Sequence, residues 1–145
     1  MEWANELRPQ TIDDLVGQEA NKQILKAWVE KGLPNAIILY GKSGCGKTTT
    51  SRILAKTLNA EYIELDAASN NGVEDARKIN ELASRLSING NTKIFCIDEA
   101  HALSNAAWQA LLKTIEQPNL KTHFIFCSTE YSKLPATIRG RSRLL

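Results

Sequence analysis

The sequence predicts an α/β domain in which a central parallel sheet of about five strands is covered by helices on both faces. One observation behind this prediction is that short apolar runs alternate along the chain with longer segments of helical periodicity. A second is the glycine-rich stretch 41–48, which joins an apolar run to a helical segment. At 145 residues the chain has the length of one domain with a single core. We therefore expect residues 1–145 to form one domain.

Composition and charge exclude several classes of protein. The chain is 43% hydrophobic and 23% charged, which is typical of a folded domain. Its 18 basic and 16 acidic side chains give a net charge of +2, so any contact with DNA must be local or made by an assembly. The cysteines Cys45, Cys96 and Cys127 form no C-x-x-C pair, which argues against a zinc finger and fits a reducing compartment. Apolar runs of about five residues and the lack of a signal-peptide pattern predict a cytoplasmic protein without a membrane partner.

The first half of the chain contains two expected helices and two expected strands. Residues 18–31 have the periodicity of an amphipathic helix, and the breakers in residues 32–35 end it. Its apolar face is expected to consist of Ala20, Ile24, Ala27 and Trp28. The next expected elements are the strand Ala36–Tyr40, a helix from Thr49 to Leu58 and the strand Glu61–Leu65.

The second half continues the alternation. A helical pattern begins at Val73 and ends near residues 89–91, and the following strand, Lys93–Asp98, is apolar enough to be buried on both faces. Ser104 is a candidate N-cap for the next helix, which Pro118 ends. Its core stripe is expected to be Ala107, Trp108, Leu111, Leu112 and Ile115. The last expected elements are the strand His123–Ser128 and the start of a fifth strand at residues 143–145.

Residues 41–48 fit the phosphate-binding pattern G-x-x-x-x-G-K-[ST] without a mismatch. The glycines let several backbone N–H groups point at one spot, where the N-terminus of the next helix adds a partial positive charge. Lys47 is placed to reach the β- and γ-phosphates of ATP, and the Thr48 hydroxyl is placed to ligate Mg²⁺. A plain glycine turn is the alternative, which the flanking strand and helix disfavour. The residues expected to hold the nucleotide here are Gly41, Lys42, Ser43, Gly44, Cys45, Gly46, Lys47, Thr48 and Thr49.

Asp98 and Glu99 follow an apolar strand, as in the Walker B arrangement. The carboxyl ends of parallel strands face the crevice in which ligands bind, so we expect Asp98 to hold Mg²⁺ and Glu99 to act as the general base on water. A pair of solvated acids is the alternative. At the end of the next strand, Thr129, or else Ser128, is expected to contact the γ-phosphate or the attacking water; a strand-end cap is the alternative.

Arginine and histidine supply further candidates. Arg139, Arg141 and Arg143 alternate and would share a face in an extended segment, and a guanidinium is suited to a phosphoryl-transfer transition state. A solvated basic strand end is the alternative. His101 is expected to be a structural partner and His123 a surface residue. Residues 98–101 also spell DEAH, a motif that occurs in helicases.

Several segments together resemble the AAA+ ATPase subunits of DNA clamp loaders. The resemblance is to the bacterial DNA polymerase III gamma/tau subunits first and to the replication factor C small subunits next. It covers nearly the whole chain. Besides the two Walker motifs, the matching segments are Leu7–Gln18 (LRPQTIDDLVGQ), Asp66–Arg77 (DAASNNGVEDAR), Ile97–Ser104 (IDEAHALS), Ala110–Pro118 (ALLKTIEQP) and Lys133–Ser142 (KLPATIRGRS).

The resemblance implies an AAA+ P-loop NTPase fold and an ATPase that works with neighbouring subunits in a ring. It implies that Arg8, Pro9 and Val16 lie in the segment around the adenine, that Thr129 senses the γ-phosphate and that Arg141 completes the ATP site of the neighbouring subunit. The partners it implies are the other clamp-loader subunits, the sliding clamp and primer-template DNA.

Three departures from the family pattern qualify these expectations. Gly140-Arg141-Ser142 replaces the usual Ser-Arg-Cys, which leaves Arg139 as an alternative finger. Asn59-Ala60-Glu61 runs straight into a strand where the bacterial family inserts a zinc module, so we expect ATP and Mg²⁺ as cofactors but no zinc. The lid and collar domains of the family are expected to be missing from residues 1–145. The competing functions are another AAA+ DNA motor such as a branch-migration ATPase, a DEAH-type helicase domain, and an ATP-binding structural subunit that does not hydrolyse.

Overall fold

The computed structural model describes residues 19–41, 47–85, 92–116, 121–141 and 143–144. They form one five-stranded sheet in the order β2-β3-β4-β1-β5, and every pair of neighbouring strands is parallel. The sheet confirms the predicted α/β architecture and strand number. The strands are β1 (Ala36–Tyr40), β2 (Glu61–Asp66), β3 (Lys93–Asp98), β4 (Thr122–Ser128) and β5 (Arg143–Leu144).

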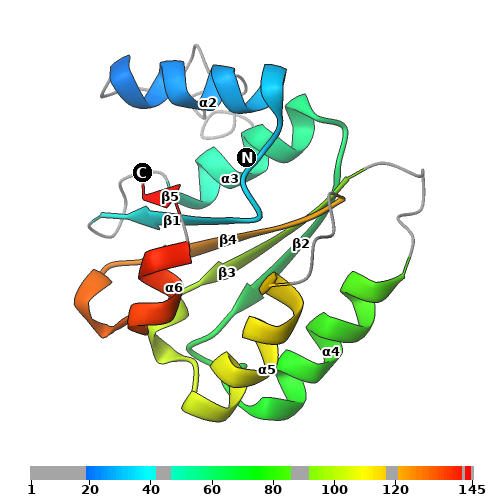
Figure 1. Cartoon of the computed structure of the whole chain (residues 1–145), viewed down its shortest axis with the longest axis vertical. Helices are drawn as coiled ribbons and strands as arrows, with labels where there is room; N and C mark the ends of the chain where they lie inside the picture. The colour runs from blue at the N-terminus through cyan, green and yellow to red at the C-terminus, as the bar shows by residue number, and fades with distance from the viewer. Residues whose placement is uncertain (1–18, 42–46, 86–91, 117–120, 142, 145) are drawn as a thin grey trace, which may run out of the picture.

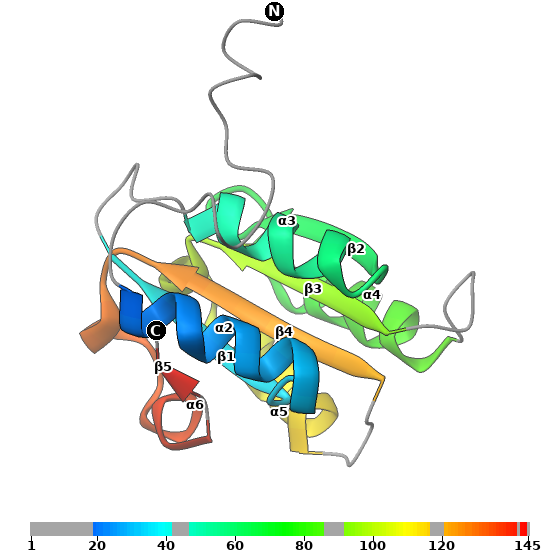
Figure 2. The ribbon, with the colours of Figure 1, turned by 90° about the horizontal axis from the view of Figure 1, so that it is seen from above.

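Helices cover both faces of this sheet (Figures 1 and 2). On one face lie α2 (Glu19–Lys31) and α3 (Lys47–Thr57). On the other lie α4 (Val73–Ser84), α5 (Asn105–Glu116) and the short α6 (Ala136–Arg141). Two short 3₁₀ helices, η2 (Ala100–Ala102) and η3 (Tyr131–Lys133), directly follow the ends of β3 and β4.

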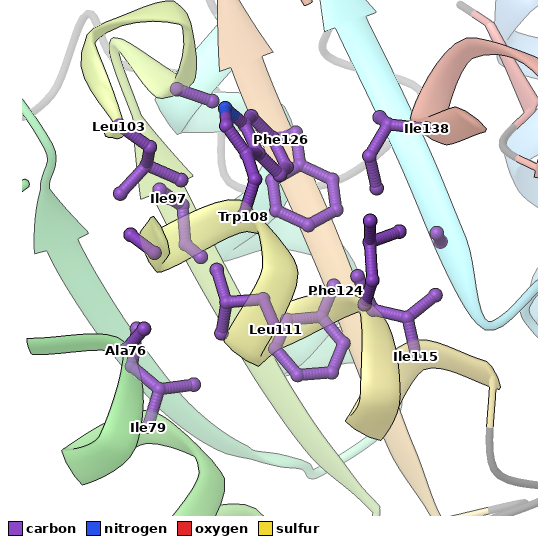
Figure 3. Close-up of a cluster of buried hydrophobic side chains, with 14 of the residues drawn as sticks. Ala76, Ile79, Ile97, Leu103, Trp108, Leu111, Ile115, Phe124, Phe126 and Ile138 are labelled. Atoms are coloured by element: carbon purple, nitrogen blue, oxygen red, sulfur yellow. The ribbon is translucent and has the colours of Figure 1, made fainter. Parts of the chain in front are cut away.

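The central strands separate two apolar clusters because their side chains alternate between the faces. The larger cluster packs the sheet against α4, α5 and α6, and Figure 3 shows Trp108 beside Phe126 in it, with ring centroids 5.1 Å apart. The smaller packs the sheet against α2 and α3 and includes Leu39, Leu54 and Ile125. β3 and β4 are therefore buried on both faces, as a parallel strand flanked by helices must be.

The predicted apolar face of α2 is right at Trp28 but wrong at Ile24, and the prediction of His123 as a surface residue is wrong. In α2, Leu25 is buried while Ile24 is 39% exposed. Leu25, Trp28 and Val29 have the same helical spacing as the predicted set, so periodicity alone did not decide between two adjacent faces. His123 is buried, and its Nδ1 lies 2.9 Å from the carbonyl oxygen of Pro34, which makes it part of the β4 start rather than of the surface.

The helix ends follow local chemistry. The Ser104 hydroxyl accepts a hydrogen bond from the Ala107 N–H at 3.1 Å, which confirms the predicted N-cap of α5. Gly32 follows α2 directly and has φ +115°, a value that residues with a side chain rarely adopt. Its N–H bonds to the Trp28 carbonyl oxygen at 2.8 Å. These caps fix where the helices that frame the sheet begin and end.

The tail after β4 is helical where the alternating arginines suggested an extended segment. α6 contains Arg139 and Arg141, so these two residues do not share the face of a strand. The reason is packing: Ile138 of α6 is buried in the larger cluster, together with Leu134, which precedes the helix. After α6, the described residues Arg143–Leu144 form β5, which pairs with β1 as the predicted fifth strand.

Candidate nucleotide-binding site

The carboxyl ends of β1, β3 and β4 meet at one edge of the sheet. Tyr40 at the end of β1 is in register with Ser128 at the end of β4, and Asp66 is in register with Asp98. The Gly41 N–H bonds to the Ser128 carbonyl oxygen at 3.2 Å, which ties the residue after β1 to β4. This edge is where open parallel sheets bind ligands.

Lys47 begins α3 beside this edge. Its Nζ donates a hydrogen bond to the Gly41 carbonyl oxygen at 2.9 Å, so the ammonium group is directed back toward the first residue of the glycine-rich stretch. Thr48 and Thr49 lie half-buried in the first turn of the same helix. A helix N-terminus with an adjacent ammonium group attracts phosphate.

Asp98 and Glu99 lie at the end of β3, in the central part of the edge. The Asp98 Oδ1 accepts a hydrogen bond from the Glu99 N–H at 3.0 Å, and the Asp98 backbone carbonyl accepts one from the Ala67 N–H at 2.9 Å. Glu99 has φ 53° and ψ 44°, the left-handed conformation that non-glycine residues seldom adopt. Residues in such conformations are frequent in active sites.

A histidine joins the ends of β3 and β4. His101 Nε2 lies 3.3 Å from Glu99 Oε2 and 3.2 Å from Glu130 Oε2. Its Nδ1 lies 2.9 Å from the hydroxyl oxygen of Ser128, a fully buried residue. That hydroxyl also accepts the Glu130 N–H at 2.9 Å. The Ser128 side chain is therefore committed to contacts within the protein, whereas the half-buried Thr129 has no such hydrogen bond to a described residue.

The carboxylates suit a cation that is shared with a ligand. Among the described residues, no group of three or more His, Cys, Asp or Glu side chains has a metal-binding arrangement. Mg²⁺ is usually bound by one or two protein oxygens together with phosphates and water, and Asp98 and Thr48 can supply such oxygens. The arrangement can hold a nucleoside triphosphate with Mg²⁺ and place the Glu99 carboxylate near a water molecule beside the γ-phosphate.

Several predicted residues lie outside the described part of the chain. These are Arg8, Pro9, Val16, Lys42, Ser43, Gly44, Cys45 and Gly46. Arg141 is the last residue of α6, and its side chain is likewise not described. Arg139, the alternative finger, lies over the Tyr131 ring of its own chain, with its guanidinium carbon 5.7 Å from the ring centroid. Its buried Nε has no hydrogen-bond partner among the described residues.

With this geometry in view, comparison with known proteins gives the family. A model of the ATPase family associated with various cellular activities (AAA) matches residues 37–145, three quarters of the chain. The chain belongs to the AAA ATPase family. Nucleotide use is the property that the family shares, and both the resemblance and the P-loop fold predicted from the sequence are confirmed.

Curated relatives of this AAA domain are bacterial replication proteins. It is 35% identical over 158 residues to DNA polymerase III subunit gamma/tau of Mycoplasma pneumoniae, a match that covers 92% of this chain and 23% of that protein. It is 36% identical over 159 residues to DNA polymerase III subunit tau of Bacillus subtilis, covering 92% of this chain and 28% of that protein. The chain thus spans about a quarter of the length of these relatives. An alignment of 158 residues exceeds the 145 of this chain, so the relative has extra residues within the match.

A solved structure of a branch migration motor has the same fold. The AAA domain superposes on the RuvB Holliday junction branch migration motor of Thermotoga maritima with a TM-score of 0.78 and 26% sequence identity. The match covers 96% of this chain and 48% of that one. In the part of the AAA domain that the structure describes, no helix has the length and apolar character needed to cross a membrane.

The contacts of His101 with Ser128, Glu99 and Glu130 were not predicted from the sequence. The sequence placed His101 three residues after Asp98 but gave no indication that Ser128 and Glu130 would be its neighbours. The available signal was indirect: both segments follow apolar strands, and the ends of parallel strands share an edge. The predicted structural role of His101 is therefore compatible with the geometry but incomplete.

Proposed function

We propose that this chain is the ATP-binding and ATP-hydrolysing unit of a sliding-clamp loader subunit in DNA replication. The observation that carries the chemistry is that Lys47, Asp98 and Glu99 lie at one edge of the sheet, which Gly41 connects to β4. The identity of 35% and 36% to DNA polymerase III gamma/tau and tau subunits supports the clamp-loading role.

In this proposal each residue has a defined task. The glycine-rich loop and the start of α3 bind the phosphates, Lys47 neutralises the β- and γ-phosphates, and Thr48 and Asp98 hold Mg²⁺. Glu99 accepts a proton from the attacking water. Thr129 rather than Ser128 contacts the γ-phosphate, because the Ser128 hydroxyl is occupied by His101 and by the Glu130 N–H.

ATP would act on a ring of subunits through differential contacts. The γ-phosphate bridges Lys47 of one subunit and Arg141 of the next, so the triphosphate form stabilises the interface and the diphosphate form does not. The cation–π contact of Arg139 with Tyr131 in its own chain supports Arg141 as the finger. The ring then opens a sliding clamp and holds primer-template DNA in the cytoplasm, and hydrolysis releases both.

A branch-migration ATPase is the second candidate, and the structural match to the RuvB motor, with a TM-score of 0.78 and 26% identity, is the observation that supports it. The two functions share the hydrolytic chemistry and differ in the DNA that stimulates it. A clamp loader is expected to respond to primer-template DNA together with a sliding clamp, whereas a branch-migration motor responds to four-way junctions. RNA-stimulated hydrolysis without a response to a clamp would instead favour the helicase reading.

The decisive experiment mixes two inactive variants of the complete protein. Lys47→Ala and Arg141→Ala proteins are each expected to lose nearly all ATP turnover, and a mixture is expected to recover part of it because one chain supplies the nucleotide and another the arginine. Lys56→Ala and Arg77→Ala are matched controls, because Lys56 lies in the last turn of α3 and Arg77 pairs with Glu74 on the exposed side of α4. Failure to recover while sedimentation shows mixed oligomers would reject the shared site.

A further inference from the structure

The two ring nitrogens of His101 have different neighbours. Among the described residues, Nε2 has ion-pair contacts with two carboxylate oxygens, Glu99 Oε2 at 3.3 Å and Glu130 Oε2 at 3.2 Å. Carboxylates accept and do not donate hydrogen bonds, so both contacts are favourable when Nε2 carries the proton. A single N–H cannot form two short, linear bonds, and both distances are longer than the usual 2.9–3.0 Å. Glu99 and Glu130 therefore flank the same ring nitrogen in electrostatic contact.

The other side of the ring is anchored in the core. Nδ1 lies 2.9 Å from the Ser128 hydroxyl, and Ser128 belongs to the fully buried end of β4. The His101 side chain is only 14% exposed, so its position is set by the protein rather than by solvent. Any displacement of the β4 end is consequently transmitted to the donor that contacts Glu99.

Glu130 is held independently of Glu99. Its Oε1 contacts Lys133 Nζ at 3.0 Å, and its backbone N–H bonds to the Ser128 hydroxyl at 2.9 Å. Thr129 lies between the two residues that His101 contacts on this side, Ser128 and Glu130. The His101 ring therefore contacts Glu99 and both neighbours of Thr129, the residue proposed to contact the γ-phosphate.

We propose that His101 is a positioning residue for the base Glu99. Anchored to Ser128 at the end of β4, the His101 ring orients the Glu99 carboxylate through its Nε2–H. The inference rests on the proposed function, because it requires that Glu99 acts on water. His101 itself touches neither water nor nucleotide in this scheme. Its N–H occupies one carboxylate oxygen of Glu99 and leaves the other to accept the proton.

Two substitutions separate the two nitrogens of the ring. An asparagine amide reaches about as far as Nδ1 and can keep the contact with Ser128, whereas a glutamine amide reaches about as far as Nε2 and can keep a donor near Glu99. We expect His101→Asn to lower kcat for ATP about 10- to 100-fold with little change in KM, since misplacing a catalytic group has effects of this size. His101→Gln is expected to restore most of the rate.

A matched control comes from the other histidine of the chain, His123, which is buried. His123 also makes its Nδ1 contact within the core, to the Pro34 carbonyl at 2.9 Å, but it lies at the opposite end of β4 from Ser128. His123→Asn is expected to change thermal stability without a selective loss in kcat. An equal loss of kcat in His123→Asn and His101→Asn, after correction for the folded fraction, would overturn the inference.

The final measurement is a double-mutant cycle with Glu99→Gln in the complete protein. If His101 acts through Glu99, His101→Asn lowers the rate about 10-fold or more in the parent but less than about twofold in Glu99→Gln. Equal effects in both backgrounds would overturn the positioning role. A normal rate for Glu99→Gln alone would instead reject Glu99 as the base and the inference with it. A slow Glu99→Gln with an unaffected His101→Asn would reject only the role of His101.

Discussion

Replacing Ser128 by Ala and Thr129 by Val is expected to separate a structural hydroxyl from a functional one. The Ser128 hydroxyl contacts His101 Nδ1 and accepts the Glu130 N–H, each at 2.9 Å, at a residue with no exposed surface. The Thr129 hydroxyl is half-buried and has no hydrogen bond to a described residue. Loss of the first should therefore reduce stability, and loss of the second should reduce turnover.

The expected stability loss for Ser128→Ala follows from two hydrogen bonds. Each contributes about 1 kcal/mol net, and more when the remaining partner stays buried without a substitute, so we expect a loss of about 2–3 kcal/mol in the free energy of unfolding. For a chain of this size that corresponds to a fall in Tm of about 4–12 °C. Thr129→Val keeps the side-chain volume and should leave Tm within about 2 °C, because it removes no internal hydrogen bond.

Thermal unfolding of the two variants and their ATP turnover below the transition are the required assays. Thr129→Val is expected to lower kcat about 10-fold or more, as the loss of a hydrogen bond to a developing charge does. Ser128→Ala removes the anchor of His101 and is expected to lower kcat as well, but less than Thr129→Val does when both variants are fully folded. The reverse result, a stable Ser128→Ala without activity and an active Thr129→Val, would show that Ser128 faces the nucleotide and refute the assignment.

Two further predictions concern charges that support the sheet. Lys93 is only 4% exposed, and its Nζ donates hydrogen bonds to two carbonyl oxygens at the end of α4. Lys93→Met is therefore expected to lower the free energy of unfolding, measured in urea, by about 2–3 kcal/mol. The control Lys78→Met, on the exposed side of α4, should change it little. The paired Arg52 guanidinium, at 2.8 and 3.0 Å, lowers the pKa of the partly exposed Glu64 carboxyl, so Glu64→Gln should cost up to about 1 kcal/mol at neutral pH. Because a lowered carboxyl pKa stabilises the fold only while the group is ionised, this difference should fade as the pH drops below about 4.3, and a pH-independent loss would contradict the ion-pair account.

The sequence was sufficient for the elements that carry their own signals. β1, β3 and β4 are apolar runs whose positions agree with the prediction, and β3 is buried on both faces as predicted. The N-cap at Ser104 was predictable because capping is a local interaction between residues three positions apart. Tertiary packing reinforces these local preferences and did not need to override them.

Other features depend on neighbours that sequence order does not reveal. By sequence, Lys93 resembles the polar first residue of a strand. It is buried because its Nζ bonds to the carbonyl oxygens of Leu82 and Arg85 at the end of α4. α6 has only six residues, too few to form a stable helix alone, so it exists because Ile138 packs into the core. The alternation of Arg139 and Arg141 was a local pattern that this packing overrode.

Backbone conformation at Glu99 shows why this edge of the sheet was only partly predictable. The two non-glycine residues with positive φ in the described part of the chain are Asn59 and Glu99, each at φ 53°. Asparagine tolerates this conformation in turns, whereas glutamate adopts it at a cost of about 1–2 kcal/mol. Nothing in the letters Asp-Glu-Ala-His encodes that conformation. The Asp98 carboxylate at the end of β3 accepts the Glu99 N–H, and His101 of η2 contacts both the Glu99 side chain and the Ser128 hydroxyl at the end of β4. The proposed orientation of the base therefore depends on the pairing of β3 with β4.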